Sequence, residues 1–130
     1  MKAIDPAKSS NYLTKAENSL RIAKIALEQE AYDNAIMSSI HSAINSLDAL
    51  TTSCLGKRAS GSHNDVVTLI KGIFSEKERL DISRQFTTLL SLKNTSEYQP
   101  DLMKKSDAES SIVNAERIFT KVKAKLQEKK

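Results

Sequence analysis

The run AIMSSIHSAINSLDAL, residues 35–50, determines the architecture of this chain of 130 residues. Between Ile36 and Leu50 its larger apolar residues recur at intervals of three and four, which is the spacing of one face of an α-helix. A second line, of serine and alanine side chains, lies beside this stripe. Because small side chains let another backbone approach closely, the run predicts a helix from about Tyr32 to Ser53 at the centre of a helical bundle or of a dimer.

On either side of this run the sequence predicts another helix. Asp5 and Pro6 indicate the start of a first helix, since Asp can cap a helix and Pro fits its first position. Apolar residues at helical spacing continue it to about Gln29. After the run, the segment CLGKRASGSHND, residues 54–65, is rich in Gly and Ser without apolar periodicity, so we expect a loop. Ser62, near its end, can cap a short helix of aliphatic residues.

The second half of the chain predicts two more long helices. The sequence SEKE, which begins at Ser75, has the spacing of a capping box and opens a helix that should end before Pro100. The same spacing at Ser106 opens the last helix, whose apolar residues recur regularly up to Leu126. We therefore predict an all-α fold, an antiparallel up-down bundle of four long helices plus one short helix, in a single domain over residues 1–130.

The composition agrees with helices and excludes several classes of protein. Aromatic residues make up 5% of the chain and there are only two Pro and three Gly, whereas β-rich proteins rely on aromatic and β-branched residues with frequent turns. The single Cys54 excludes an intramolecular disulfide and a cysteine-built metal site. The N-terminus lacks a hydrophobic signal region and no apolar run reaches about 18 residues, so we expect a cytoplasmic protein with no membrane span.

The net charge and the positions of the two histidines do not indicate a nucleic-acid-binding arm or a metal site. The net charge of +4 is modest, and much of it lies in residues 121–130, where basic residues suit a helix C-terminus. We interpret this tail as a solvated helix end rather than a nucleic-acid-binding arm. His41 is interpreted as a hydrogen-bonded packing residue. No Glu-x-x-His pair exists and no two His share a helix face, so neither a metal nor a cofactor is expected.

Two stretches of the chain match a known helical family. His63 is followed by Val66, Ile70 and Phe74, which is the order of a His, a spacer and an aliphatic run reaching a Phe. The stretch LKNTSEY, residues 92–98, keeps the basic, acidic and aromatic characters of the pattern Leu-Arg-x-x-Ala-Asp-Tyr. In these features the chain resembles the HEPN superfamily, in which the first pattern enters the third helix and the second ends the fourth. The resemblance implies a helical bundle, often a partner of a minimal nucleotidyltransferase.

The catalytic pair of HEPN ribonucleases is missing from its expected place. These enzymes carry Arg-x4-6-His near the end of the fourth helix, with a Tyr two residues after the His. Aligned on Tyr98, the two positions fall on Ser96 and about Ser91. Serine replaces neither residue, because His titrates at a pKa of about 6.5 suited to proton transfer and Arg stabilises developing phosphate charge. The resemblance therefore implies a degenerate, non-catalytic module.

Another pair of residues has the catalytic spacing. Arg58 and His63 spell Arg-x4-His, but they lie in the predicted loop, whereas the family places its pair on a helix that faces the dimer partner. A match at this spacing arises easily by chance. Arg58 and His63 are thus the alternative catalytic candidates, beside the simpler interpretation of a helix-capping His63 and an exposed Arg58.

The candidate ligand-binding residues are four polar or aromatic side chains of the predicted fourth helix: Arg84, Lys93, Glu97 and Tyr98. If the bundle brings the basic ones together with the loop, they would line a groove that attracts phosphate. The simpler interpretation of Lys93 and Glu97, four residues apart, is a surface pair worth a few tenths of a kcal/mol.

Three hypotheses about function follow. The first is a HEPN-like interaction or nucleotide-binding module, a homodimer that pairs with a nucleotidyltransferase in a toxin–antitoxin-type system. The second is a metal-independent ribonuclease of the same family that uses Arg58 and His63. The third is a helical scaffold without a ligand, in which the polar residues near Tyr98 are scattered and solvated. A ribonuclease requires the Arg and His side chains to converge within a few ångströms, and an RNA binder requires convergent basic residues with an aromatic for stacking.

Overall fold

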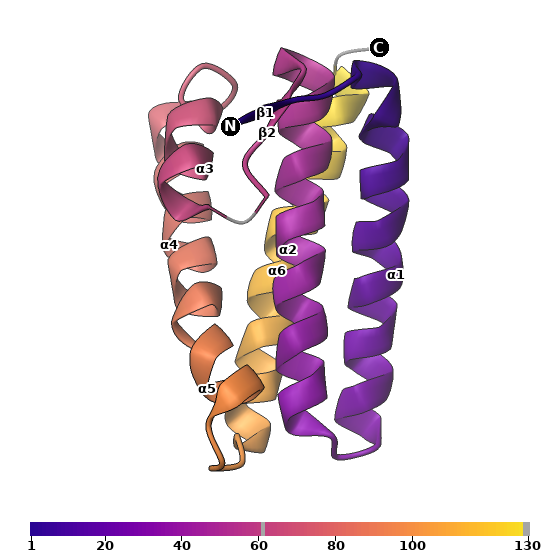
Figure 1. Cartoon of the computed structure of the whole chain (residues 1–130), viewed down its shortest axis with the longest axis vertical. Helices are drawn as coiled ribbons and strands as arrows, with labels where there is room; N and C mark the ends of the chain where they lie inside the picture. The colour runs from indigo at the N-terminus through magenta and orange to yellow at the C-terminus, as the bar shows by residue number, and fades with distance from the viewer. Residues whose placement is uncertain (61, 129–130) are drawn as a thin grey trace.

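The computed structural model describes residues 1–60 and 62–128. Their elements in chain order are β1 (Lys2–Ala3), the 3-10 helix η1 (Pro6–Lys8), α1 (Ser9–Glu28), α2 (Tyr32–Leu55), β2 (Lys57–Arg58), α3 (His63–Ile70), α4 (Glu76–Ser91), α5 (Lys93–Tyr98) and α6 (Lys105–Glu128). Figure 1 shows α2 in the middle, with α1 on one side, the α3–α4 pair on the other and α6 behind. The predicted all-α bundle is confirmed.

The helix around the quoted run is the central one, as predicted. Of the 24 residues of α2, 13 are buried. The small residues of α2 do let α1 approach closely. Two serine hydroxyls, one from each helix, bind backbone carbonyls of the other helix. Ser42 donates to the carbonyl of Ala16 at 2.8 Å, and Ser9 donates to the carbonyl of Ala49 at 2.7 Å. These two bonds fix α1 antiparallel to α2.

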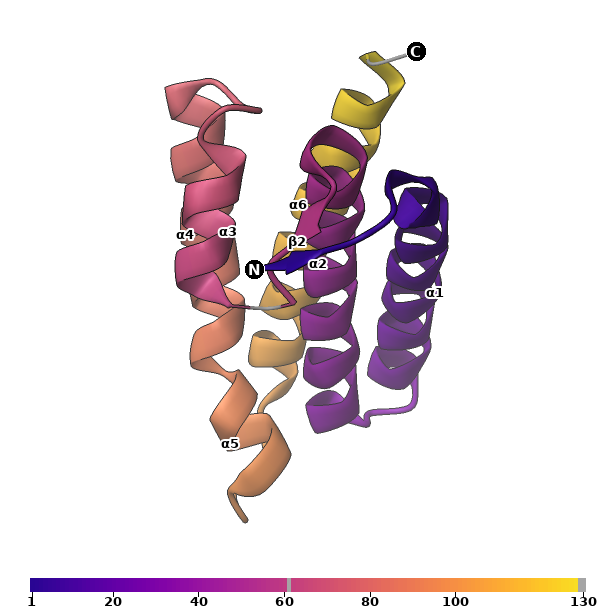
Figure 2. The ribbon, with the colours of Figure 1, turned by 45° about the horizontal axis from the view of Figure 1, so that its top comes forward.

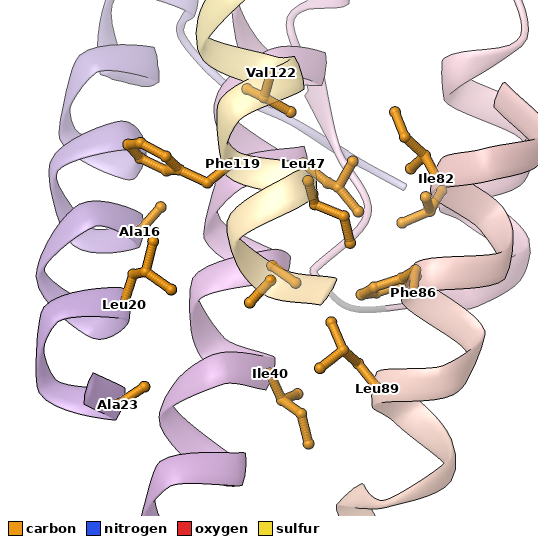
Figure 3. Packing of buried hydrophobic residues seen from close by; sticks show 14 of the residues in the cluster. Ala16, Leu20, Ala23, Ile40, Leu47, Ile82, Phe86, Leu89, Phe119 and Val122 are labelled. Carbon is orange, nitrogen blue, oxygen red and sulfur yellow. The ribbon is translucent and has the colours of Figure 1, made fainter. Parts of the chain in front are cut away.

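The core lies where the four long helices meet. In Figure 3, Ile40 of α2 lies near Leu89 of α4, and Leu47 of α2 lies on the side of α4 that carries Phe86. Phe119 of α6 points the other way, toward α1. Phe86 and Ile40 are fully buried, and Leu47 is 1% exposed. Since complete burial of one such side chain stabilises the fold by about 1.5–3 kcal/mol, this shared cluster holds the helices together.

Of the three serines predicted to cap helices, two are observed at the start of a helix. The Ser62 hydroxyl accepts the backbone N–H of Asp65 at 3.4 Å and caps α3. Ser75 and Glu78 form the full capping box at the start of α4, with each side chain accepting the other residue's backbone N–H. These hydrogen bonds from Ser75 are the main reason that the pKa of Glu78 lies below its ordinary value.

The third predicted start is wrong by about two residues. Ser106 lies inside the first turn of α6, which begins at Lys105. The Asp107 carboxylate instead reaches back and accepts the backbone N–H of Lys104 at 3.3 Å. A carboxylate at the third residue of α6 can satisfy the free N–H of Lys104, which directly precedes the helix, so a capping box that starts at Ser106 is not needed.

The predicted fourth helix is divided in two. α4 ends at Ser91, and α5 starts at Lys93 with a change of direction (Figure 1). Around the break, hydroxyls bond to carbonyls of the same helix: Thr88 donates to Arg84 at 3.0 Å, and Ser91 donates to Thr88 at 2.6 Å. Such bonds compete with the helical ladder and bend helices, which explains the break at Leu92.

A small sheet occupies part of the predicted loop. β1 pairs antiparallel with β2, so that Lys2 lies opposite Arg58, and the Ile4 N–H donates to the carbonyl of Gly56 at 2.9 Å. Gly56 ends α2 with φ of +63°, a conformation that favours glycine. The N-terminal segment thus crosses the C-terminal end of α2 and holds the start of the loop that leads to α3.

Candidate functional site

The loop between α2 and α3 is held by a buried carboxylate. Asp48 is 3% exposed, and its Oδ1 accepts the backbone N–H of Ala59 at 3.2 Å and that of Ser60 at 3.0 Å. Ser60 adopts a positive φ of 52°, which the loop requires to turn toward α3. Asp48 therefore sets the path of the chain on which both alternative catalytic candidates lie.

Burial dominates the electrostatics of this carboxylate. It raises the pKa of Asp48, because a charge is less stable away from water, and the hydrogen bonds from Ser60 and Ala59 and the charge of Arg58 oppose the rise. Sequence reasoning missed Asp48 as a site residue. The available signal was that Asp48 is the only Asp, Glu, Lys or Arg in the run 35–50.

Arg58 points from β2 toward α1. Its guanidinium carbon lies 6.0 Å from the centre of the Tyr12 ring, within the range of a cation–π contact. The residue is partly buried rather than exposed.

His63 points the other way, toward α4. Its ring stacks on Phe86 with 6.2 Å between the ring centres, and its Nε2 lies 2.8 Å from the hydroxyl of Thr87. That hydroxyl already donates its hydrogen to the carbonyl of Ser83 at 2.7 Å, so it must accept from His63. Nε2 therefore carries the proton, and His63 packs at the first position of α3.

The structure does not bring Arg58 and His63 together. Their side chains contact α1 and α4 respectively, and these helices lie on opposite sides of α2 in both views (Figures 1 and 2). The expectation that Arg58 is simply exposed is corrected by its contact with Tyr12, whereas His63 does lie where α3 is capped.

The two positions that the resemblance aligns with a catalytic pair, Ser91 and Ser96, carry hydroxyls that bind nearby groups. Ser91 donates to the carbonyl of Thr88. The Ser96 hydroxyl lies 3.2 Å from the sulfur of Met37 and 3.2 Å from the carbonyl of Lys93, so it ties α5 to α2. Neither position supplies an acid, a base or a cation.

The four predicted ligand-binding residues fall on two separate helices. Arg84 lies on α4 and pairs with Asp81 at 2.9 Å, with 72% of its side chain exposed. Lys93 and Glu97 are exposed on α5, and Tyr98 at its end is 71% exposed. Because the chain turns at Leu92, Arg84 and the α5 residues do not continue one helix face.

Neither a metal centre nor a membrane span is found in the described residues. Over residues 1–60 and 62–128, no group of three or more His, Cys, Asp and Glu residues is placed to hold a metal ion. In the same part of the chain no helix combines the length and apolar character needed to cross a membrane.

His41 is exposed on α2, and its backbone carbonyl accepts from Asn45.

Comparison with known proteins identifies the family. The HEPN domain model matches residues 9–125, from the first residue of α1 almost to the end of α6. The chain belongs to the HEPN domain family. The match confirms the resemblance derived from residues 63–74 and 92–98. No curated protein sequence matches the chain.

A solved structure shares the bundle of this HEPN domain. TT1696 from Thermus thermophilus, known from its crystal structure, superposes with a TM-score of 0.76 at 16% sequence identity. The superposition covers 91% of this chain and 98% of that one. At this identity the similarity shows the fold alone.

Proposed function

We propose that this HEPN domain, a single unit over residues 1–130, is a non-catalytic interaction module: a homodimer that pairs with a nucleotidyltransferase in a toxin–antitoxin-type system. The observation that carries the proposal is the divergence of Arg58 and His63, which contact opposite sides of the bundle. The hydroxyl bonds of Ser91 and Ser96 support the same conclusion, because those positions hold serines engaged with backbone carbonyls.

Nucleotide binding belongs to the same proposal in a restricted form. Lys93 and Tyr98 are both exposed on α5, so one could neutralise a phosphate while the other stacks on a base. Arg84 would join them only from the neighbouring helix, after release from Asp81. Glu97 would accept from a sugar hydroxyl or a base N–H. Nucleotide binding that weakens with salt and is lost in Tyr98→Ala would support this assignment.

The test of the main proposal is RNA cleavage by the purified protein, beside His63→Ala and with the molar mass determined by light scattering on the same sample. We expect a dimer and no cleavage by either protein. Cleavage by the wild type that is absent in His63→Ala would establish the ribonuclease hypothesis instead. Thr87→Val is the matched control, since it removes the hydrogen bond to the His63 ring but leaves the imidazole in place.

The partner is tested by co-purification. Where a neighbouring gene encodes a minimal nucleotidyltransferase, co-expression should yield a complex of defined stoichiometry. A nucleotidyltransferase that elutes separately at micromolar concentrations would contradict the pairing.

A further inference from the structure

One side of α2, a helix with 13 of its 24 residues buried, remains open. In Figure 1, α2 lies in front of α6, and the β1–β2 pair crosses it near its C-terminal end. Below that crossing, the open strip consists of Asn34 and His41, which are exposed, and Ser38 and Asn45, which are partly exposed. Their spacing of four, three and four residues places them on one helix face.

The open strip has no Asp, Glu, Lys or Arg, although 28% of the residues of the chain are charged. The only such residues of α2 are Asp33 and Asp48, and both accept backbone N–H groups of other segments. The chain carries a net charge of +4, so two copies repel each other through their charged faces. They can approach through the open strip without that repulsion, and depletion of charge is typical of interface centres.

The side chains of the open strip can also form hydrogen bonds with the same strip of a second copy of the chain. Asparagine amides and serine hydroxyls, which make up three of the four residues, each contain both a donor and an acceptor. A strip of lysines or of carboxylates would have only one kind of group and could not pair with itself. A partner of strong opposite charge would gain nothing here, so a second copy of this chain fits best.

The spacing of the strip is the same from either end. Asn34 precedes Ser38 by four residues, as His41 precedes Asn45. If two α2 helices cross antiparallel about a two-fold axis midway between Ser38 and His41, Asn34 faces Asn45 of the partner subunit and Ser38 faces His41 of the partner subunit. Reciprocal contacts of this kind are what a two-fold interface requires.

We propose that two copies dimerise through the open strip, with α2 antiparallel to α2 of the partner subunit in this register. The proposal rests on the homodimer of the proposed function and specifies its interface. Ser38 is small enough to let the two helices reach the usual 8–10 Å separation. Met37 and Ile44, partly exposed beside the strip, add apolar contact, and Ile22 of the neighbouring α1 is 49% exposed. Such flanking residues are needed, because stable interfaces bury about 1,200–2,000 Å².

Light scattering over a dilution series tests the interface. The test variant is Ser38→Lys, which puts an unpaired charge at the centre of the strip in each subunit. We expect its dimer dissociation constant to rise by about a hundredfold or more, while Ser110→Lys, at an exposed serine of α6, stays dimeric like the wild type. Circular dichroism confirms that both variants keep the helical fold.

Disulfide formation between two single-cysteine chains tests the register. In a Cys54→Ala background, Asn34→Cys and Asn45→Cys chains should form a disulfide-linked heterodimer when mixed, and neither should link to itself. A disulfide requires Cα atoms within about 7 Å, which facing positions satisfy and the other pairs do not. Self-linking of either variant, or no heterodimer from a dimeric mixture, would overturn the antiparallel register.

The outcomes separate this proposal from the broader one. A monomeric wild type would overturn both this interface and the homodimer of the proposed function. A Ser38→Lys protein as dimeric as the wild type would leave the homodimer in place and overturn only its assignment to the open strip.

Discussion

Replacement of Asp48 by alanine should destabilise the fold through the α2–α3 loop. The substitution removes the acceptor of two backbone N–H groups. Ala59 is 6% exposed, so its N–H would stay buried and unpaired, at a cost of about 1–3 kcal/mol. Ser60 is exposed and can donate to water, so the loss of its bond costs about 0.5–1.5 kcal/mol. We expect the free energy of unfolding to fall by about 2–3 kcal/mol.

Urea denaturation followed by circular dichroism measures this loss. For a domain of this size the melting temperature should fall by roughly 6–12 °C. Asp48→Asn is the control, because its amide oxygen can accept the same two N–H groups without a buried charge, and it should remain within about 1 kcal/mol of the wild type. An Asp48→Ala protein within about 0.5 kcal/mol of the wild type would refute the claim that Asp48 holds the loop.

The same pair of proteins has a defined pH dependence. Burial raises the pKa of Asp48 in the folded state above the ordinary value of about 3.9 that it has in the unfolded chain. Between these two pKa values the folded state binds more protons than the unfolded state, so stability is greatest below the window and falls as pH rises through it. The unfolding free energy of the wild type minus that of Asp48→Asn should therefore decrease from pH 4 upward. An increase over that range would show that the hydrogen bonds outweigh burial.

The remaining predictions concern local structure. Ser75→Ala should lower the unfolding free energy by about 1 kcal/mol, whereas Ser106→Ala should change it by less than about 0.5 kcal/mol, and equal effects in urea denaturation would contradict the assigned starts of α4 and α6. Gly56→Ala should lower the unfolding free energy by about 1 kcal/mol because of the positive φ alone, since an added Cβ would meet the backbone oxygen of Ile4 at an ordinary 3.5 Å. An unchanged unfolding free energy would argue against the left-handed cap. Phe86→Ala should cost about 3–5 kcal/mol, and Leu80→Ala on the exposed side of α4 should cost far less.

Features fixed by near neighbours in the chain could be predicted from the sequence. The apolar spacing between Ile36 and Leu50 predicts the helix α2, since periodicity directly reflects burial of one face, and the line of small residues beside it predicts the central position. Ser75 was recognised because its capping partner lies three residues away. The break at Leu92 was missed, because it depends on hydroxyls that can equally well point to solvent.

Features that join distant segments were not predictable. The pairing of Lys2 with Arg58 involves two strands of two residues each, too short to show an alternating pattern. The Arg-x4-His spacing suggested a catalytic pair, but spacing alone does not give the direction of the side chains in a loop. The path of the loop depends on the carboxylate of Asp48, which accepts the backbone N–H of Ala59, 11 residues further along the chain.

The two acidic residues of α2 explain how its surface is divided. Asp48, toward the C-terminal end, binds the loop after β2, and that segment covers the helix there. Asp33, in the first turn, accepts the backbone N–H of Met103 at 2.9 Å and so holds the connection between α5 and α6. Each charge is therefore used to bind another part of the chain over one end of α2. Between them the helix has no Asp, Glu, Lys or Arg, and over residues 1–60 and 62–128 the open strip from Asn34 to Asn45 stays exposed or partly exposed. A second copy of α2, oriented antiparallel, would cover the middle of the helix as the chain's own segments cover its two ends.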